Sequence, residues 1–246
     1  MINVRKIAKL IIGDNLYWKL KFFYATKKWP NIYDPTFFNE KVRWRMLHDQ
    51  NYLYVKCADK YEVRNYIEKK IGSEYLVPLR YMFTNNDDIT DKCILSNSVA
   101  KSNHGAGMIE FIPETYSLSE LKNTFGKWLN LDYTSESNEK HYSRIPRKIL
   151  IEESLCKEGK PPVDYKFHTF KQADGSFRFV LQLVNGRFHN ESRGYYLEDL
   201  NKCIWSHGEG FHSIPQEHIK PLKKAMELSS ILCEDFNYVR VDWYIY

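Results

Sequence analysis

Two alternating segments joined by a tight turn place the strongest constraint on what this chain can fold into. DYKFHTF (164–170) and SFRFVLQLV (176–184) flank Ala173-Asp174-Gly175. An Asp-Gly pair between alternating runs is a strong local signal for a β-hairpin. Asn185-Gly186 marks another tight turn directly after the second run. We therefore expect an antiparallel sheet in the last part of the chain.

The first 74 residues are predicted to be helical. A turn at Asp34-Pro35 precedes a segment that places Val42, Met46 and Leu47 on one helical face.

A second helix is predicted from residue 59 to residue 71. Asp59 can cap it, Glu62 stands three residues on as in a capping box, and Gly72 supplies the stop. Its apolar stripe consists of Val63, Tyr66 and Ile67.

Short apolar runs follow from about residue 75. Residues 93–114 predict a strand, a glycine-containing loop and a returning strand, and Ser117 caps a helix lined by Leu121, Phe125 and Trp128. After a strand in ILIEESL and the hairpin come a helix over 215–236 and a last strand, YVRVDWYIY.

The fold class indicated by this order is α+β. We expect a helical N-terminal region (1–74), a small α+β lobe with the glycine loop (75–148) and a C-terminal antiparallel-sheet lobe (149–246), with the two lobes around a cleft.

The net charge of +5 suits an anionic ligand, but basic residues occur along the whole chain and no RNA- or DNA-binding motif is present. Cys57, Cys93, Cys156, Cys203 and Cys233 form neither a CxxC pair nor an even set, which favours reduced thiols and a cytoplasmic location.

The N-terminal 29 residues mix Lys and Arg with large apolar side chains. Lys9, Asp14, Lys19 and Lys21 interrupt the apolar runs, so we expect neither a membrane-spanning helix nor a signal peptide. The segment fits an amphipathic helix, either packed on the domain or lying on an anionic membrane surface at the inner face of the membrane.

The glycine loop is the first candidate for chemistry. Gly105 and Gly107 allow a close backbone approach to phosphate oxygens, and Lys101 at the loop mouth offers an ammonium. A plain hairpin has the same pattern, and neither GxxxxGK[ST] nor GxGxxG is present.

Two further candidates lie on strands. In ILIEESL a buried strand ends in two carboxylates, either reaching a ligand or running out into solvent. In DYKFHTF, alternation places Lys166 and His168 on one face, opposite Tyr165 and Phe167.

The last strand carries Arg240 and Asp242 on one face, opposite Val239, Val241 and Trp243. The two charged residues form either a simple ion pair, or a site in which Asp242 binds Mg²⁺ and Arg240 binds an anionic substrate. Periodicity leaves both readings open.

Taken together, the chain from about Pro35 to Tyr246 resembles the TupA-like ATP-grasp proteins of bacterial surface-polysaccharide clusters. The resemblance rests on six segments in order: FNEKVRWRMLHD, ADKYEVRNYIEKKIGSEYLVPL, VAKSNHGAG, ILIEESL, DYKFHTF and YVRVDWY. It implies an ATP-grasp fold, ATP and Mg²⁺ as cofactors, and an ATP-dependent carboxylate–amine ligase that acts through an acyl phosphate.

The resemblance also implies roles for individual residues. Lys101 and Lys166 would contact ATP phosphates, and the loop of Ser102, Asn103, His104, Gly105 and Gly107 would cover them.

For the base, the resemblance implies that Glu152 meets the adenine amino group and that the backbone of Glu153 and Leu155 borders the ring. Asp242 would bind Mg²⁺, and Arg240 with Arg187 would face the acceptor or the acyl-phosphate side.

Asp59, Lys60 and Arg64 match a family motif to which the resemblance assigns no role, and helix capping with surface pairing accounts for them equally well.

One family feature is expected to be missing. The family's metal strand is followed by another with a second carboxylate, typically in a Gly-Glu-Leu-Thr-like stretch, whereas this sequence ends at Tyr246, soon after Asp242. Family context suggests an amino acid and a uronic-acid-bearing glycan precursor as substrates. The alternatives are a glycosyltransferase of a polysaccharide cluster, a phosphotransferase, or a non-catalytic nucleotide-binding partner.

Overall fold

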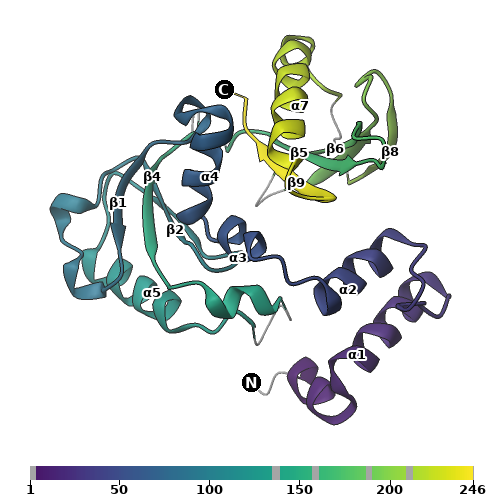
Figure 1. Ribbon diagram of the computed structural model, residues 1–246. Helices are drawn as coiled ribbons and strands as arrows, with labels where there is room; N and C mark the ends of the chain where they lie inside the picture. Colours follow the sequence, from purple (N-terminus) through teal and green to yellow (C-terminus); the bar gives the residue numbers. More distant parts are fainter. Residues whose placement is uncertain (1–3, 135–138, 157–160, 187–189, 209–212, 246) are drawn as a thin grey trace. The chain divides into compact units, whose positions relative to one another are not determined.

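The computed structural model describes residues 4–134, 139–156, 161–186, 190–208 and 213–245, the side chains of residues 4–6 excepted. The chain divides into two compact units (Figure 1). Unit 1 comprises residues 1–63 and 78–152, and unit 2 comprises residues 64–77 and 153–246. Each unit contains an antiparallel sheet with helices, so the predicted α+β class is confirmed.

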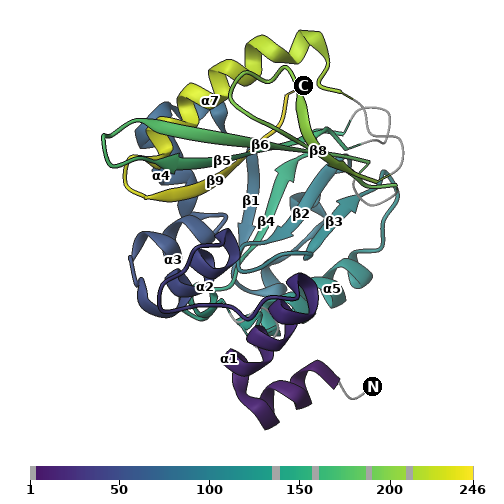
Figure 2. The same ribbon diagram turned by 90° about the vertical axis from the view of Figure 1, so that its right-hand side faces the viewer.

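Unit 1 contains a sheet with strand order β1-β4-β2-β3, seen face-on in Figure 2. Its strands are β1 (Leu79–Phe83), β2 (Ser98–Ser102), β3 (Ile109–Ile112) and β4 (Ile149–Glu153). Strands β2 and β3 pair antiparallel around the glycine loop, and β1 pairs antiparallel with β4. The predicted strand, loop and returning strand are therefore confirmed.

Helix α5 (Leu118–Asn130) packs on this sheet and closes the core of unit 1. As predicted, Ser117 caps it, because the Ser117 hydroxyl accepts a hydrogen bond from the Glu120 N–H at 3.4 Å. Leu121 and Phe125 are buried against Ile149 and Ile151 of β4. Short 3₁₀ turns at Asn86–Asp88, Asp91–Cys93 and Lys140–Arg144 join the elements of this unit.

The N-terminal helices of unit 1 are α1 (Val4–Thr26), α2 (Phe38–His48) and α3 (Leu53–Ala58). The apolar face of α2 is not its buried face, because Met46 is exposed and Val42 and Leu47 are half-buried. The buried residues of α2 are Glu40 and Arg43. The Glu40 carboxylate accepts hydrogen bonds from the N–H groups of Asn31, Thr36 and Phe37, each at 2.9 Å. A charged residue is buried here because the preceding loop surrounds it with donors.

Those donors also set the charge state of Glu40. Burial favours its neutral acid, but the hydrogen bonds to the carboxylate outweigh burial and lower its pKa. Sequence periodicity could not show this, since the donors come from a loop without a regular pattern.

Helix α4 (Glu62–Ile71) begins in unit 1 and continues in unit 2. Asp59 caps it as predicted, accepting from the Tyr61 N–H at 2.8 Å, and Gly72 ends it with a φ of 108°. The predicted capping box between Asp59 and Glu62 is not formed. The Asp59 N–H bonds to the Val55 carbonyl instead, and the Glu62 carboxylate pairs with Lys148 at 3.3 Å.

Unit 2 contains a sheet with strand order β8-β7-β6-β5-β9. Its strands are β5 (Asp164–Lys171), β6 (Phe177–Asn185), β7 (Ser192–Tyr196), β8 (Cys203–His207) and β9 (Tyr238–Trp243). The predicted hairpin is the β5–β6 pair, with Asp164 opposite Val184 and Lys171 opposite Phe177. Strands β7 and β8 were not predicted, because their sequences lack a clear alternation.

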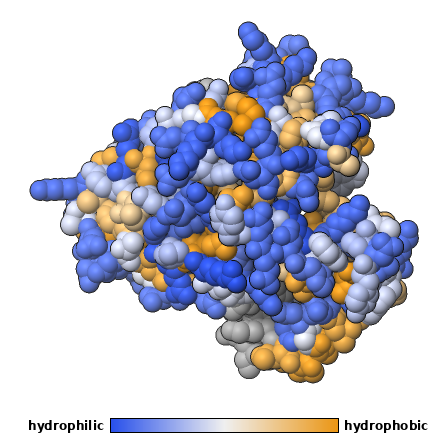
Figure 3. Space-filling view, viewed as in Figure 1, coloured by the Kyte–Doolittle hydropathy of each residue, from blue (hydrophilic) through white to orange (hydrophobic). Residues whose placement is uncertain are grey.

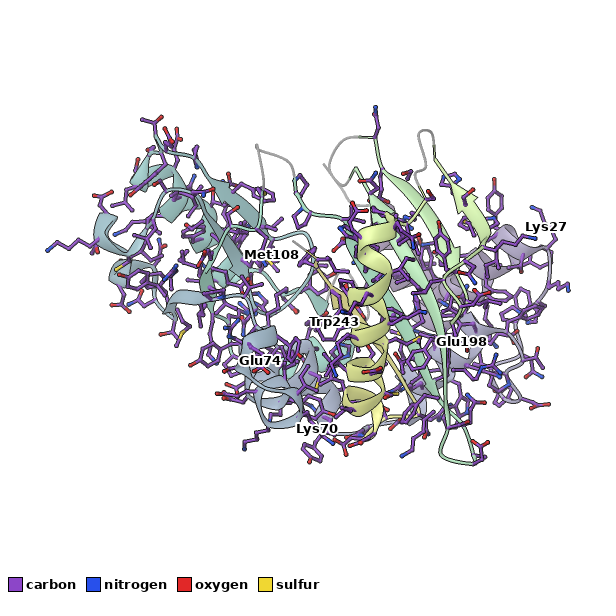
Figure 4. All side chains as sticks on the ribbon, turned by 90° about the horizontal axis from the view of Figure 1, so that it is seen from above. Lys27, Lys70, Glu74, Met108, Glu198 and Trp243 are labelled. Carbon is purple, nitrogen blue, oxygen red and sulfur yellow. The ribbon has the colours of Figure 1, made fainter. Side chains whose placement is uncertain are left out.

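Helix α7 (Ile219–Cys233), preceded by a 3₁₀ turn at Gln216–His218, lies across one face of this sheet (Figure 1). The apolar core beneath it includes Tyr165, Phe167, Leu181 and Leu222. Trp243 of β9 lies beside the helix in Figure 4, and its ring N–H donates to the Ser229 hydroxyl at 2.9 Å. Because Tyr165 and Phe167 of β5 both lie in this core, the alternation predicted for β5 is confirmed.

The rest of α4 packs on the C-terminal end of α7. After a 3₁₀ turn at Ser73–Tyr75, the Tyr75 ring lies 6.0 Å from the Trp243 ring of β9. The Tyr66 hydroxyl donates to the Leu232 carbonyl at 3.0 Å, and Lys70 pairs with Glu234 and Asp235. Most of a helix that belongs with the N-terminal segments in sequence is thus part of unit 2 in space.

Within the described part of the chain, no helix is both long and apolar enough to cross a bilayer. All five cysteines are free thiols, and Cys233 is buried.

The core beneath α7 allows a direct test of how unit 2 is stabilised. Leu222 is fully buried, whereas the next residue, Lys223, is exposed. We expect Leu222→Ala to lower the free energy of unfolding of unit 2 by about 2–5 kcal/mol, because it removes buried methyl groups and leaves a cavity. Lys223→Ala is the matched control and should change it by less than about 0.5 kcal/mol. Urea unfolding measures both, and equal effects would contradict the assigned core.

Candidate functional site

Unit 1 contains a partly buried lysine–carboxylate pair at the mouth of the glycine loop. Lys101 of β2 donates to the Glu152 carboxylate of β4 with an Nζ–Oε2 distance of 2.7 Å. Glu152 is buried, and the Lys101 side chain is about one-quarter exposed. The pair brings together two residues predicted separately from the glycine-loop segment and from ILIEESL.

The glycine loop points its polar side chains inward. Ser102, Asn103 and His104 are all buried. The Ser102 hydroxyl lies 2.7 Å from His104 Nδ1, and His104 Nε2 lies 3.3 Å from the Leu131 carbonyl. Burial lowers the pKa of His104, and nearby Arg147 and Lys60 add to the effect, so the ring is neutral at pH 7.

The exposed part of the loop carries no polar side chain. Ala106 and Gly107 form its tip, and Gly107 has a φ of 80° with open space where a Cβ would stand. By contrast, a Cβ on Gly105 would approach the Met108 and Tyr133 side chains to 2.7 Å. Glycine is thus required at 105 by packing and at 107 by backbone conformation.

Lys60 holds the loop from the opposite side. Its ammonium donates to the Ser102 carbonyl at 2.9 Å and to the Gly105 carbonyl, and its backbone N–H donates to the Asn103 carbonyl at 3.2 Å. Burial, together with the nearby Lys101 charge, lowers the pKa of Lys60 to about 8, although Glu152 and Asp59 act in the opposite direction. Lys60 therefore belongs to the same charged cluster as Lys101 and Glu152.

Asn103 completes this connection. Its amide donates to Asp59 Oδ1 at 2.9 Å and to the Pro146 carbonyl at 2.8 Å, and it accepts from the Lys148 N–H at 2.7 Å. The helix cap, the glycine loop and the start of β4 are linked through one side chain. Asp59 and Lys60 thereby support the glycine loop, a role beyond the helix capping and surface pairing that the sequence suggested.

Unit 2 has its own charged cluster on the sheet face opposite α7. The Lys166 ammonium lies 3.2 Å from Asp164 Oδ2 and 2.9 Å from Asp242 Oδ2. Lys166 and Asp242 are directly opposite in the β5–β9 register. Arg240 Nε donates to Asp242 Oδ1 at 2.7 Å, and a second guanidinium nitrogen donates to Oδ2 at 2.9 Å.

The cluster keeps Asp242 ionised. Burial favours its neutral acid, but the hydrogen bonds and charges of Arg240 and Lys166 outweigh burial and hold the pKa of Asp242 below its usual range. The Arg–Asp ion pair, one of the two readings of the last strand, is therefore formed, and it leaves an anionic oxygen donor on this face.

His168 extends the same face along β5. Its Nδ1 lies 2.8 Å from the Tyr238 hydroxyl, and its Nε2 lies 3.4 Å from the Gln182 amide oxygen. Burial lowers the pKa of His168, so the ring is neutral at pH 7. Alternation predicted that His168 would share the face of Lys166. Asp164 lies on the same face by the same rule, and sequence reasoning overlooked it.

The other predicted residues occupy less defined positions. Glu153 ends β4 and is exposed, and Leu155 is half-buried after the strand. Arg187 lies outside the described residues. No group of three or more His, Cys, Asp or Glu side chains that could hold a metal occurs among the residues the structure describes.

Each unit thus combines an antiparallel sheet with a lysine–carboxylate cluster. Residues 40–246 match the family model described as TupA-like ATPgrasp, and because the match covers most of the chain, the protein belongs to that family. Membership implies the ATP-grasp fold, and ATP-grasp enzymes are ATP-dependent ligases. Comparisons with curated proteins and with solved structures gave no match.

The lowered pKa of Lys60 makes a testable prediction about pH. Between its folded value of about 8 and its unfolded value near 10.5, the unfolded chain binds more protons than the folded protein. The contribution of Lys60 to the free energy of unfolding therefore rises with pH in this window. We expect the wild-type value minus the Lys60→Met value to increase by about 2 kcal/mol between about pH 7.5 and about pH 9.5.

Denaturant unfolding at several pH values measures this difference. Lys41→Met, at an exposed position of α2 in the same unit, is the control and should give a constant difference. Parallel curves for the wild type and Lys60→Met would show that the Lys60 ammonium is not perturbed.

Proposed function

We propose that this protein is an ATP-dependent ligase that joins a carboxylate to an amine through an acyl phosphate. Family membership over residues 40–246 is the observation that carries the proposal. The two lysine–carboxylate clusters support it, because each positions an ammonium group where a phosphate oxygen can replace or join the carboxylate.

We assign ATP phosphates to Lys101 and Lys166 and the loop backbone near Gly107. The inward-facing Ser102, Asn103 and His104 leave main-chain N–H groups, rather than side chains, to contact a ligand. Glu152 is assigned to the adenine amino group and is paired with Lys101 in this structure, so binding of the base would require the carboxylate to leave or share that lysine. The backbone of Glu153 and Leu155 would border the ring.

The residues of unit 2 fit Mg²⁺ by type. Asp242 is an ionised carboxylate, and the carboxylates of Asp242 and Asp164 both contact the Lys166 ammonium. Mg²⁺ bound with ATP commonly takes only one or two protein carboxylates, the rest of its ligands being phosphate oxygens and water. When bound, the ion would neutralise phosphate charge. Asp242 would hold it after exchanging its contact with Lys166.

In the proposed reaction, a substrate carboxylate oxygen forms a bond to the γ-phosphorus as the bond to the β–γ bridging oxygen breaks and ADP leaves. The amine nitrogen then attacks the acyl carbon, phosphate leaves, and the nitrogen loses a proton to solvent. Lys101 and Lys166 would stabilise the phosphate charge that develops in the first step. Arg240, with Arg187, is assigned to the acceptor carboxylate, which a guanidinium binds in a bidentate manner.

For substrates, we propose an amino acid and a uronic-acid-bearing glycan precursor of bacterial surface-polysaccharide synthesis, with the reaction in the cytoplasm where ATP is available. The TupA-like family supports this assignment. The positive Arg240 side chain, about half exposed, is compatible with an acidic sugar.

Nucleotide binding is the first test. We expect ATP with Mg²⁺ to raise the melting temperature of the wild type, since saturation at about a hundredfold over Kd adds about 2.7 kcal/mol to the free energy of unfolding. The double variant Lys101→Met/Glu152→Gln, which removes both charges and leaves no buried carboxylate unpaired, should lose most of this shift. Lys127→Met, exposed on α5, should retain it. An unchanged shift in the double variant would exclude Lys101 from the nucleotide site.

Turnover is the second test. ADP release should require both a carboxylate and an amine, and Asp242→Asn should reduce the rate by about 100- to 1000-fold, because one electrostatic stabiliser is lost. Glu227→Gln, on the exposed side of α7, is the charge-matched control. ADP release without the amine would indicate a phosphotransferase, whereas UDP release from a UDP-sugar without ATP would indicate a glycosyltransferase.

A further inference from the structure

The positive charge of this protein is concentrated at its N-terminus. Basic residues occur throughout the chain, but the first 28 residues contain seven of them and only one acidic residue, Asp14. Their net charge is therefore +6, against +5 for the whole chain, so the remaining residues together carry −1. Charge that is distributed this unevenly marks a surface for an anionic partner.

The same segment exposes large apolar side chains. Helix α1 bends at Gly13, where φ is 76° and ψ is 154°, into two shorter helical parts. Leu10 and Ile11 in the first part are 79% and 76% exposed. Leu16, Leu20 and Phe23 in the second part, spaced four and three residues apart, lie on one face and are all exposed. Figure 3 shows apolar surface over the position that α1 has in Figure 1.

The opposite face of α1 is the one that packs on unit 1. The Phe22 ring is buried and lies 6.2 Å from the Phe37 ring. Arg43 of α2 donates to Asn15 Oδ1 at 2.5 Å and lies 5.7 Å from the Trp18 ring. Because α1 is already anchored by these residues, its exposed apolar face is not needed to hold the helix to its own unit.

Lysines border the exposed apolar face. On a helical wheel Lys19 and Lys21 fall on the two sides of the stripe of Leu16, Leu20 and Phe23. Lys27, labelled at the end of α1 in Figure 4, lies 4.6 Å from the ring of the exposed Tyr24. An apolar stripe flanked by ammonium groups is the pattern of a helix that lies in a membrane interface.

We propose that α1 docks this protein on an anionic lipid surface, with the helix parallel to the membrane plane. The charge decides the occupant. A second copy of the chain would bring +6 against +6, whereas anionic headgroups complement the lysines and the acyl boundary accepts the apolar stripe. The surface is independent of the proposed ligase reaction, since the family match begins at residue 40, after α1.

Vesicle flotation with the full-length protein tests the proposal. Vesicles of phosphatidylcholine alone and of phosphatidylcholine with about one-third phosphatidylglycerol are compared at low and high salt. We expect binding to the anionic vesicles that weakens as salt is added, and little binding to the neutral ones. Binding to both kinds equally, or to neither, would overturn the proposal.

Two variants separate the apolar and the charged contributions. Leu10→Asn/Ile11→Asn should reduce the partition coefficient about tenfold or more by removing buried apolar area. Lys19→Glu/Lys21→Glu should reduce it about thirtyfold or more, since each lysine near an anionic surface contributes roughly fivefold. Melting temperatures should change little, because Leu10, Ile11 and Lys21 are exposed and Lys19 is only half-buried.

Ile204→Asn is the matched apolar control, since Ile204 is exposed on β8 of unit 2, and Lys223→Glu/Lys224→Glu on α7 is the charge control. Both should bind like the wild type, and an equal loss in these controls would contradict a surface located on α1. Light scattering gives the oligomeric state. A dimer that Leu10→Asn/Ile11→Asn converts to a monomer, with no vesicle binding, would assign the surface to a second copy instead.

Discussion

The register between β5 and β9 is the constraint on which unit 2 depends. Because side chains alternate along a strand, pairing Lys166 with Asp242 fixes which residues face α7 and which face the other way. Tyr165 and Phe167 then enter the core, and Arg240 joins the charged face. A slip of one residue would bury the charges under α7 and expose the aromatic rings, so the core and the charged cluster specify the same register.

The charged face is held by pairing rather than by exposure to water. The Lys166 ammonium is buried between Asp164 and Asp242, and the free-energy cost of removing its charge from water is offset only while both carboxylates remain ionised. In unit 1 the Glu152 carboxylate offsets, in the same way, the cost of partly burying the Lys101 charge. In each unit the lysine is positioned in advance by an anion of the protein, so a phosphate that replaces that anion meets an ordered donor at little further entropic cost.

The glycine loop is held at its base by hydrogen bonds to residues of other segments. Its carbonyl groups are bound by Lys60, and Asn103 ties it to Asp59 and to the start of β4. The tip, Ala106 and Gly107, is exposed, and a Cβ on Gly107 would meet open space. Support at the base and freedom at the tip suit the proposed role of the loop, in which its backbone N–H groups would accept an anion.

Local chemistry in the sequence determined several elements in advance. Asp174-Gly175 made the β5–β6 hairpin predictable, and the caps at Asp59 and Ser117 and the alternation of β5 follow from neighbouring residues. These features depend on contacts within a few positions, so periodicity and turn chemistry are sufficient to predict them.

Tertiary structure alone decided the features that depend on distant partners. The pairing of Glu62 with Lys148 and the role of Lys60 both require groups from other segments. The free energy of a buried charge is set by the donors and charges brought around it in space, which local sequence does not encode. The sequence by itself therefore determined where strands and helices form and which residues share a face. Only the folded chain decided which charges meet.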